Sequence, residues 1–143
     1  MSDETLRSVE LTRIGKAAFS ATNVRGTTIS MSDGGNDDFT PIELLLAALA
    51  GCSAIDVDHL IGKKVDPERF NLHVQGDKIR DEGGNHMTNL RVTFDVGFPP
   101  GDDGDAALAR LPRAIQQTNE RLCTVSRTVQ LGTPVKMEIA ESE

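Results

Sequence analysis

The sequence has no tryptophan, no tyrosine and only five phenylalanines, so its core is expected to consist of aliphatic side chains. Charged residues make up 26% of the 143 residues and apolar residues 38%, a balance typical of globular and not of disordered chains. No internal repeat, low-complexity tract or linker divides the sequence. A chain of this length predicts one domain, over residues 1–143, with a buried core of its own.

Basic residues are too few to balance the acidic ones. Fifteen Lys and Arg against 22 Asp and Glu give a formal net charge of −7 and a pI of about 4.9. A negative field of this kind repels polyanions. We therefore expect neither nucleic acid nor an anionic membrane surface as a partner.

A long apolar run is also missing. The run Leu44–Ala50 is shorter than the roughly 20 residues that span a bilayer, and Glu43 and Asp56 flank it. No basic stretch followed by an apolar segment opens the chain, so no signal peptide is expected. These features predict a cytoplasmic protein. In that compartment two cysteines are more often reduced, buried or catalytic than joined in a static disulfide.

The clearest secondary-structure signal is a long helix in the first half of the chain. Thr40 suits the N-cap, Pro41 the first helical position and Glu43 the third, which completes a capping box. Gly62 is a C-terminal stop, so the helix is expected to end at Ile61. Its first half is apolar almost all round, and such a helix needs cover on every side. The sequence therefore predicts a homodimer in which a second copy supplies part of that cover.

Alternating apolar residues predict strands on both sides of this helix. Three short strands are expected within residues 9–31, with a turn at residues 23–26, and a loop rich in Gly and Asp follows at residues 32–38. A second antiparallel pair is expected from residues 70–74 and 90–96, joined by a loop of several residues. Both groups of strands are therefore predicted to form antiparallel sheets.

The last third of the chain reads as helical. After a loop at residues 99–105, apolar residues recur at helical spacing over residues 108–122, where Pro112 is expected to kink or divide the helix. A short helix over residues 125–131 and a last strand over residues 135–139 complete the order β-β-β-α-β-β-α-α-β. This order predicts an α+β fold, with antiparallel sheets packed around a long central helix.

The chain has two cysteines, Cys52 inside the apolar helix and Cys123 far along the sequence. A thiol in the middle of an apolar helix is shielded from bulk thiols, so a second thiol of the chain could be its accessible partner. Each cysteine could equally be a small buried apolar side chain. The pair is the first place to look for chemistry.

A metal site is the other arrangement that the helix suggests. Cys52, Asp56 and His59 are spaced i, i+4 and i+7, so they share one helix face, as metal ligands would. Alternatively, Asp56 and His59 mark the more polar end of the helix and interact with each other. Asp56 would also raise the pKa of Cys52. Because no second cluster of ligands is present, we expect neither a metal nor a cofactor.

Two segments resemble the OsmC/Ohr family of osmotically inducible and organic-hydroperoxide-resistance proteins. The first is Pro41–Val57, which contains Cys52, and the second is Cys123–Arg127, where many members carry Cys-Pro-Val-Ser. The resemblance extends over nearly the whole chain. It implies an intertwined α+β homodimer with two active sites at the subunit interface.

The resemblance also implies an activity, that of a thiol peroxidase acting on organic hydroperoxides. In this scheme Cys52 is the peroxidatic cysteine and Cys123 the resolving one. Attack of a thiolate on the peroxide gives a sulfenic acid, which condenses with the second thiol to a disulfide. An external dithiol, dihydrolipoyl in some members, then restores both thiols.

Members of the family place an Arg and a Glu beside the thiolate. Arg25 is the nearest match for the Arg, with Arg13 as the alternative, and a solvated turn arginine is the competing interpretation of Arg25. The family Glu usually follows the Pro directly, but here Ile42 occupies that position and Glu43 lies one residue later. One residue turns a helical side chain by about 100°, and capping already explains Glu43. The sequence therefore leaves a second function open, a non-peroxidase dimer that senses redox state or binds a small ligand.

Overall fold

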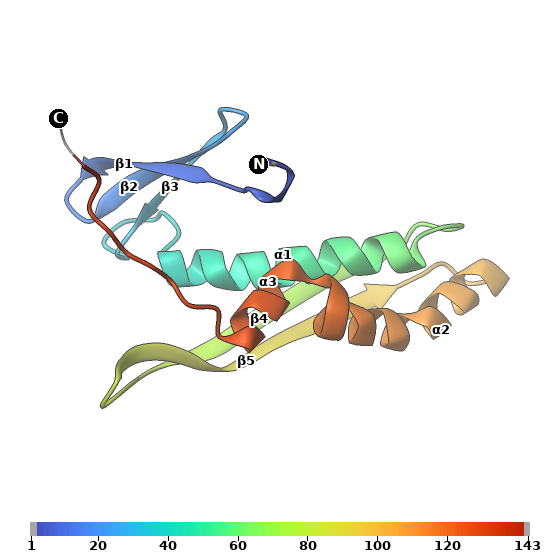
Figure 1. The fold of residues 1–143 in the computed structure, drawn as a ribbon. Helices are drawn as coiled ribbons and strands as arrows, with labels where there is room; N and C mark the ends of the chain where they lie inside the picture. The colour runs from blue at the N-terminus through green and yellow to red at the C-terminus, as the bar shows by residue number, and fades with distance from the viewer. Residues whose placement is uncertain (1–2, 142–143) are drawn as a thin grey trace. The chain divides into compact units, whose positions relative to one another are not determined.

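A computed structural model of the chain describes residues 3–141. The chain falls into two compact units, residues 1–46 and 47–143. Antiparallel sheets and helices in these units confirm the predicted α+β class (Figure 1). That residues 1–143 act as one domain stays a prediction.

The first unit is built around a three-stranded antiparallel sheet in the order β1-β2-β3. After a 3₁₀ turn, η1 (Asp3–Thr5), its strands are β1 (Val9–Gly15), β2 (Ala18–Asn23) and β3 (Thr28–Ser32). Asn23 forms the β2–β3 turn, because its Oδ1 accepts the backbone N–H of Arg25 at 2.9 Å and that of Thr27 at 3.1 Å. Gly26 has a φ of 94° within this turn. The predicted strands and the turn at residues 23–26 are confirmed.

Helix α1 runs from Pro41 to Ile61, as predicted. The capping box is formed, since the Thr40 N–H donates to Glu43 Oε1 at 2.8 Å and the Glu43 N–H donates to Thr40 Oγ1 at 3.2 Å. At the other end, Arg110 Nη2 donates to the Ile61 carbonyl at 3.1 Å. Side chains therefore satisfy free backbone groups at both ends of the helix.

The second unit contains a long antiparallel hairpin formed by β4 (Arg69–Asp81) and β5 (Gly84–Gly97). The predicted loop of several residues is wrong, because only Glu82 and Gly83 join the two strands. Gly83 N–H donates to Asp81 Oδ1 at 2.8 Å, and Gly84 has a φ of 123°. These glycines allow a tight connection that the apolar pattern does not reveal.

Helix α2 (Asp102–Gln117) begins earlier than predicted. Its first turn carries Asp102, Asp103 and Asp105, and carboxylates stabilise the amino end of a helix. Residues expected to form a loop are therefore helical. The helix also continues through Pro112, because this residue is exposed and water can satisfy the carbonyl that its missing N–H leaves free.

A π-helical turn, η2 (Thr118–Leu122), follows α2 directly, and α3 (Thr124–Leu131) comes next. As predicted, the last helix ends at Gly132, which has a φ of 65°. The predicted strand over residues 135–139 is wrong: residues 133–141 have no regular structure. No described strand satisfies their backbone, and a strand needs a neighbour for its N–H and C=O groups.

The core of the second unit lies between the hairpin and helices α1 and α2. Its buried residues are Val57, Ile61, Val96 and Ala114, and the partly buried residues packed on them are Leu60, Phe70, Phe94, Phe98, Leu111 and Ile115. Three of the five phenylalanines thus pack at the core, and the Phe70 and Phe94 ring centroids lie 6.4 Å apart. The buried residues of this core are aliphatic, as expected, and the phenylalanines pack on them from partly buried positions.

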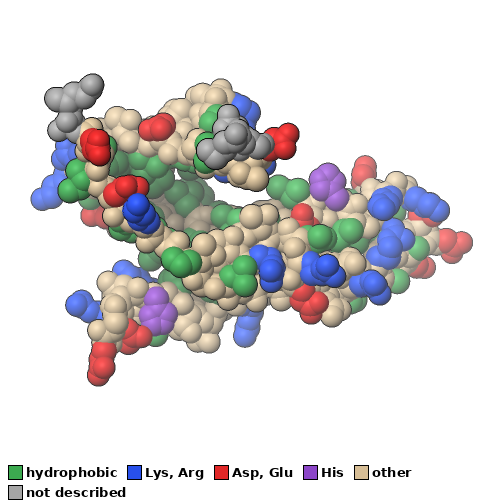
Figure 2. Space-filling model, in the orientation of Figure 1, with side chains coloured by type: hydrophobic (Ala, Val, Ile, Leu, Met, Phe, Trp, Pro, Cys, Tyr) green, Lys and Arg blue, Asp and Glu red, His purple; other side chains and the backbone are tan. Residues whose placement is uncertain are grey.

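Only one stripe of α1 is buried, with one residue in each turn: Leu49, Ser53, Val57 and Ile61. Ile55, on another face, is 61% exposed. Figure 2 shows further hydrophobic side chains at the surface. Cover for α1 by a second copy of the chain stays a prediction.

By length and composition alone, the 21 residues of α1 could cross a membrane. The shortness of the run Leu44–Ala50 therefore does not exclude a span. Core helices of soluble proteins pass the same test. Val57 and Ile61 are fully buried against the hairpin and α2, but only 22% of the apolar window is buried.

Candidate functional site

The two cysteines lie together in the second unit. Cys52 is half-buried in the middle of α1, and Cys123 is fully buried at the N-cap of α3. Both are free thiols, and they lie close enough together for Cys123 to raise the pKa of the Cys52 thiol. The structure thus brings together the two residues to which the family resemblance assigns the peroxidatic and resolving roles.

The amino end of α3 faces both sulfur atoms. The Ser126 N–H donates to Cys123 Sγ at 3.3 Å, and the backbone N–H groups of Thr124 and Val125 lower the pKa of Cys52. Cys123 therefore caps the helix with sulfur, where Ser or Thr would use oxygen. Because the amino end of a helix carries partial positive charge, this arrangement favours a thiolate.

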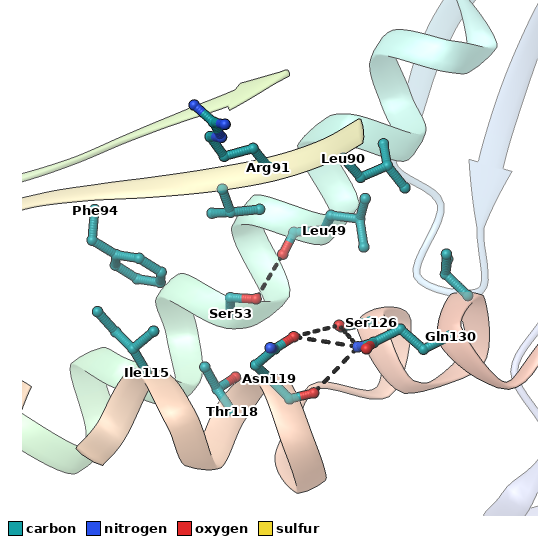
Figure 3. A pocket seen from close by; sticks show the side chains of 12 residues that line it. Leu49, Ser53, Leu90, Arg91, Phe94, Ile115, Thr118, Asn119, Ser126 and Gln130 are labelled. Carbon is teal, nitrogen blue, oxygen red and sulfur yellow. Dashed lines mark hydrogen bonds between the residues drawn. The ribbon is translucent and has the colours of Figure 1, made fainter. Parts of the chain in front are cut away.

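A further donor to Cys123 comes from α1. The Ser53 side chain is buried, and its Oγ lies 2.9 Å from the Leu49 carbonyl oxygen and 3.6 Å from Cys123 Sγ. Figure 3 shows the first of these bonds. A hydroxyl has a single hydrogen, so Ser53 donates fully to only one of the two acceptors at a time.

Thr118 holds the backbone of Cys123 in place. Its Oγ1 donates to Asp56 Oδ2 at 2.8 Å, and its carbonyl accepts the Cys123 N–H at 2.9 Å. The second bond closes the π-helical turn, and Thr118 is only 1% exposed. Asp56 on α1 thus anchors the turn that positions Cys123.

The suggested metal ligands are used differently. Asp56 is bonded to Thr118, and no hydrogen bond or ion pair described here joins it to His59. Within residues 3–141, no three His, Cys, Asp or Glu side chains are grouped as metal ligands would be. The structure therefore lends no support to a metal bound by Cys52, Asp56 and His59.

Burial raises the pKa of the Cys52 thiol, and Cys123 raises it further through the hydrogen bond and charge repulsion. The N–H groups of Val125 and Thr124 act in the opposite direction. Asp56, which the sequence suggested as a cause, is not one of these groups, and none of them is a cation. In the described surroundings, Cys52 therefore keeps its proton more tightly than an ordinary cysteine.

The other predicted site residues lie in the first unit. Arg25 is exposed in the β2–β3 turn, and Arg13 is exposed on β1. Glu43 is exposed and forms the capping box with Thr40. The capping role of Glu43 is confirmed, while roles for Arg25 and Glu43 beside a thiolate stay predictions.

A pocket of about 450 Å³ lies next to Cys123. Its lining comes from α1, β5, α2, η2 and α3 (Figure 3): Leu49, Ser53, Leu90, Arg91, Val92, Phe94, Ile115, Thr118, Asn119, Ser126, Val129 and Gln130. Gln130 Nε2 donates to Ser126 Oγ at 2.7 Å and to Asn119 Oδ1 at 3.3 Å, so one end is polar. Two lining residues, Ser53 and Ser126, contact the Cys123 sulfur.

Sequence reasoning missed Ser53 and Thr118. The one signal for Ser53 is its position directly after Cys52, as a polar residue in an apolar segment. Nothing local marks Thr118, because its partner Asp56 is 62 positions away. Such residues become visible only when the tertiary contacts are known.

Comparison with known proteins places these observations in a family. The family model described as "OsmC-like protein" matches residues 34–138. An uncharacterized protein of Mycobacterium tuberculosis is 28% identical over 131 residues, which cover 90% of this chain and 93% of that protein.

Two solved structures show the same fold. An OsmC-like protein of unknown function from Vibrio cholerae has a TM-score of 0.74 at 17% identity, over 88% of this chain and 94% of that one. The organic hydroperoxide resistance protein OsmC of Legionella pneumophila has a TM-score of 0.57 at 15% identity, over 89% and 92%. With most of its residues matched by the family model, this chain belongs to the OsmC-like protein family.

Proposed function

We propose that this chain is a thiol peroxidase that reduces organic hydroperoxides through a disulfide cycle of Cys52 and Cys123. The observation that carries the proposal is the proximity of these two free thiols, which come from distant parts of the sequence and lie close enough together for Cys123 to act on the ionisation of Cys52. Membership of the family, and the name of the Legionella pneumophila relative, support organic hydroperoxides as the substrate class.

The cycle begins at the half-buried sulfur. The Cys52 thiolate attacks one oxygen of the hydroperoxide, the O–O bond breaks, and the departing alkoxide takes a proton to give an alcohol. Cys52 becomes a sulfenic acid. The Cys123 thiolate then attacks the Cys52 sulfur, hydroxide leaves as water after protonation, and a disulfide forms.

An external dithiol closes the cycle by thiol–disulfide exchange, with dihydrolipoyl as the candidate that the family implies. It supplies two electrons and two protons and becomes a disulfide itself. We place this cycle in the cytoplasm and in a homodimer.

Formation of the Cys52 thiolate needs a cation in addition to the amides of α3, because burial and Cys123 both raise the pKa of Cys52. Arg25 is our candidate, with Arg13 as the alternative, and Glu43 is the candidate to orient that guanidinium. A guanidinium near the sulfur would favour its ionised form.

Single-turnover oxidation tests this function. The reduced protein receives one equivalent of cumene hydroperoxide or hydrogen peroxide, and free thiols and intact mass are followed in the parent, Cys52→Ser and Cys123→Ser. We expect the parent to lose both thiols rapidly with the organic peroxide, and Cys123→Ser to stop at the sulfenic acid. Cys52→Ser should keep its thiol. Parent thiols that stay reduced for many minutes with both oxidants would contradict a peroxidase.

A second candidate function is a dimer that senses redox state or binds a small ligand without turning over peroxide. The raised pKa of Cys52, the use of Glu43 as a cap and the pocket beside Cys123 favour it. This candidate gains if the thiols survive the peroxides but oxidise with a small disulfide.

A further inference from the structure

Ser53 is a buried polar side chain that the cycle above does not use. It follows Cys52 in sequence, yet its hydroxyl is directed to the other cysteine, 3.6 Å from Cys123 Sγ. It also donates to the Leu49 carbonyl at 2.9 Å. A side chain that lies on the helix of Cys52 and contacts the sulfur of Cys123 is well located to act on their reaction.

We propose that Ser53 is a positioning residue for the resolving step, in which its hydroxyl holds the Cys123 thiolate for attack on oxidised Cys52. This inference rests on the proposed disulfide cycle. It assigns Ser53 to the second chemical step and not to the reaction with peroxide.

The need for such a residue follows from burial. Cys123 is 0% exposed, so water cannot solvate its thiolate. A buried charge is costly unless hydrogen bonds replace the lost solvation. Besides the Cys52 thiol, the described donors to Cys123 Sγ are the Ser126 N–H and the Ser53 hydroxyl. Once Cys52 is a sulfenic acid, its S–H is replaced by an O–H on the group that leaves, so Ser53 and the Ser126 N–H are the described donors that stay with Cys123 through the step.

The Ser53 hydroxyl can alternate between two acceptors, the Cys123 sulfur and the Leu49 carbonyl. The Leu49 carbonyl lies one helical turn before Ser53 and accepts a backbone N–H within α1, so it does not depend on the hydroxyl. The hydroxyl can therefore turn to the sulfur when Cys123 is a thiolate. When the disulfide forms, it can return to the carbonyl and is never left unpaired in the buried site.

In the resolving step, a lone pair of the Cys123 thiolate forms the S–S bond while the S–O bond of the Cys52 sulfenic acid breaks. The released hydroxide takes a proton from solvent and leaves as water. Ser53 keeps its proton throughout, because it only orients and stabilises the attacking sulfur. Both sulfurs end at the disulfide oxidation level.

The role of Ser53 is separable from the peroxide step. The described hydrogen bonds of the Ser53 hydroxyl go to the Leu49 carbonyl and to Cys123 Sγ, and none goes to Cys52. Loss of the hydroxyl should therefore leave sulfenic acid formation unchanged. It should slow disulfide formation by about tenfold, the lower range for a hydrogen bond to a charged group.

The test compares Ser53→Val with Ser53→Thr, which have nearly the same shape and differ in the hydroxyl. Rapid-quench samples after cumene hydroperoxide are trapped with dimedone, which labels sulfenic acid, and are analysed by mass. We expect Ser53→Val to accumulate labelled Cys52 and form the disulfide about tenfold more slowly. Ser53→Thr should behave like the parent.

Thr128→Val is the matched control. Thr128 Oγ1 donates to the Thr124 carbonyl at 2.7 Å, the same helical type of bond as that of Ser53 to Leu49, but it is exposed. Its loss should change neither step. Circular dichroism of each variant separates a folding defect from a kinetic one, and Ser53→Ala replaces Ser53→Val if the latter does not fold.

The outcomes are distinguishable. If the parent forms neither sulfenic acid nor disulfide, the proposed peroxidase function fails. If the parent cycles normally but the folded variant without the hydroxyl resolves at the parent rate, the role of Ser53 is overturned. Equal slowing of both steps, or failure of Ser53→Thr to restore resolution, would also overturn it, because a purely structural effect gives those results.

Discussion

The amino end and the middle of helix α1 both carry polar side chains that suggested chemistry, but the two regions bond in different ways. At the amino end, Thr40 and Glu43 bond to each other across three positions and remain exposed. In the middle, Asp56 bonds to a residue 62 positions away, and Ser53 to one 70 positions away. The amino end stabilises the helix, whereas the middle fixes the geometry of two sulfurs.

This difference determines how much stability each substitution is expected to cost. Local, solvated bonds are replaced by water when a partner is removed. When one partner of a long-range bond in a buried site is removed, the other partner is left unpaired. The helix or turn that the bond held is also released. The largest effects should therefore come from the middle of α1 and its partners.

Thr118→Val should give the largest loss of stability. The change keeps the shape of the side chain but leaves the half-buried Asp56 without its donor, at a cost of about 1–3 kcal/mol. Urea unfolding measures this loss. Thr128→Val removes an exposed hydroxyl and should stay within about 0.5 kcal/mol of the parent. Equal losses of stability in the two variants would show that the Asp56–Thr118 bond contributes no more than an exposed hydroxyl.

Much of the fold was predictable because its signals are local. The capping box at Thr40 and Glu43, the turn at Asn23 and the alternation along β5 all depend on residues within a few positions of one another. The cysteine pair was singled out from the sequence itself, and its peroxidatic and resolving roles came from the family resemblance. The bonds of Thr118 with Asp56 and of Ser53 with Cys123 could not be predicted in the same way, because they join α1 to η2 and to the N-cap of α3.

The wrong predictions have physical reasons of the same kind. Residues 135–139 alternate as a strand does, but without a described partner strand they have no regular structure. Pro112 does not divide α2, because its exposed position lets water replace the lost bond, and a kink at this residue stays a prediction. In each case the outcome depends on what surrounds the segment and not on its own pattern.

Cys123→Ala tests how far the contacts in the middle of α1 set the pKa of Cys52. Cys123 raises that pKa by a hydrogen bond and by charge repulsion, so its removal should lower the pKa of Cys52 toward the ordinary value. At a fixed, mildly alkaline pH, a larger fraction of Cys52 is then thiolate and alkylation by iodoacetamide is faster. The rate is measured against pH in Cys123→Ala and in the parent, where mass analysis identifies the labelled cysteine.

The direction of this effect is decisive. In the parent, the alkylation rate of Cys52 should keep rising above the ordinary thiol range, because burial and Cys123 hold the proton on the sulfur. In Cys123→Ala the profile should move to lower pH. An unmoved profile would mean that burial alone sets the reactivity of Cys52.

Glu43→Ala should have a smaller effect on stability than Thr118→Val. The change removes the acceptor of the Thr40 N–H at the exposed amino end of α1, with an expected cost of about 0.5–1 kcal/mol. Urea unfolding of this variant beside Thr118→Val tests the ranking of the two regions. A loss from Glu43→Ala as large as that from Thr118→Val would contradict it.

Glu43→Gln should have the smallest effect on stability and separates the two roles considered for Glu43. Gln keeps an oxygen that accepts the Thr40 N–H, so the capping box and the unfolding midpoint should be preserved. The substitution removes the negative charge, which a role in orienting a guanidinium beside the Cys52 thiolate requires. We therefore expect unchanged stability together with slower sulfenic acid formation, measured by dimedone trapping. Unchanged stability with an unchanged rate would leave capping as the whole function of Glu43, and the cation that assists Cys52 would then act without this carboxylate.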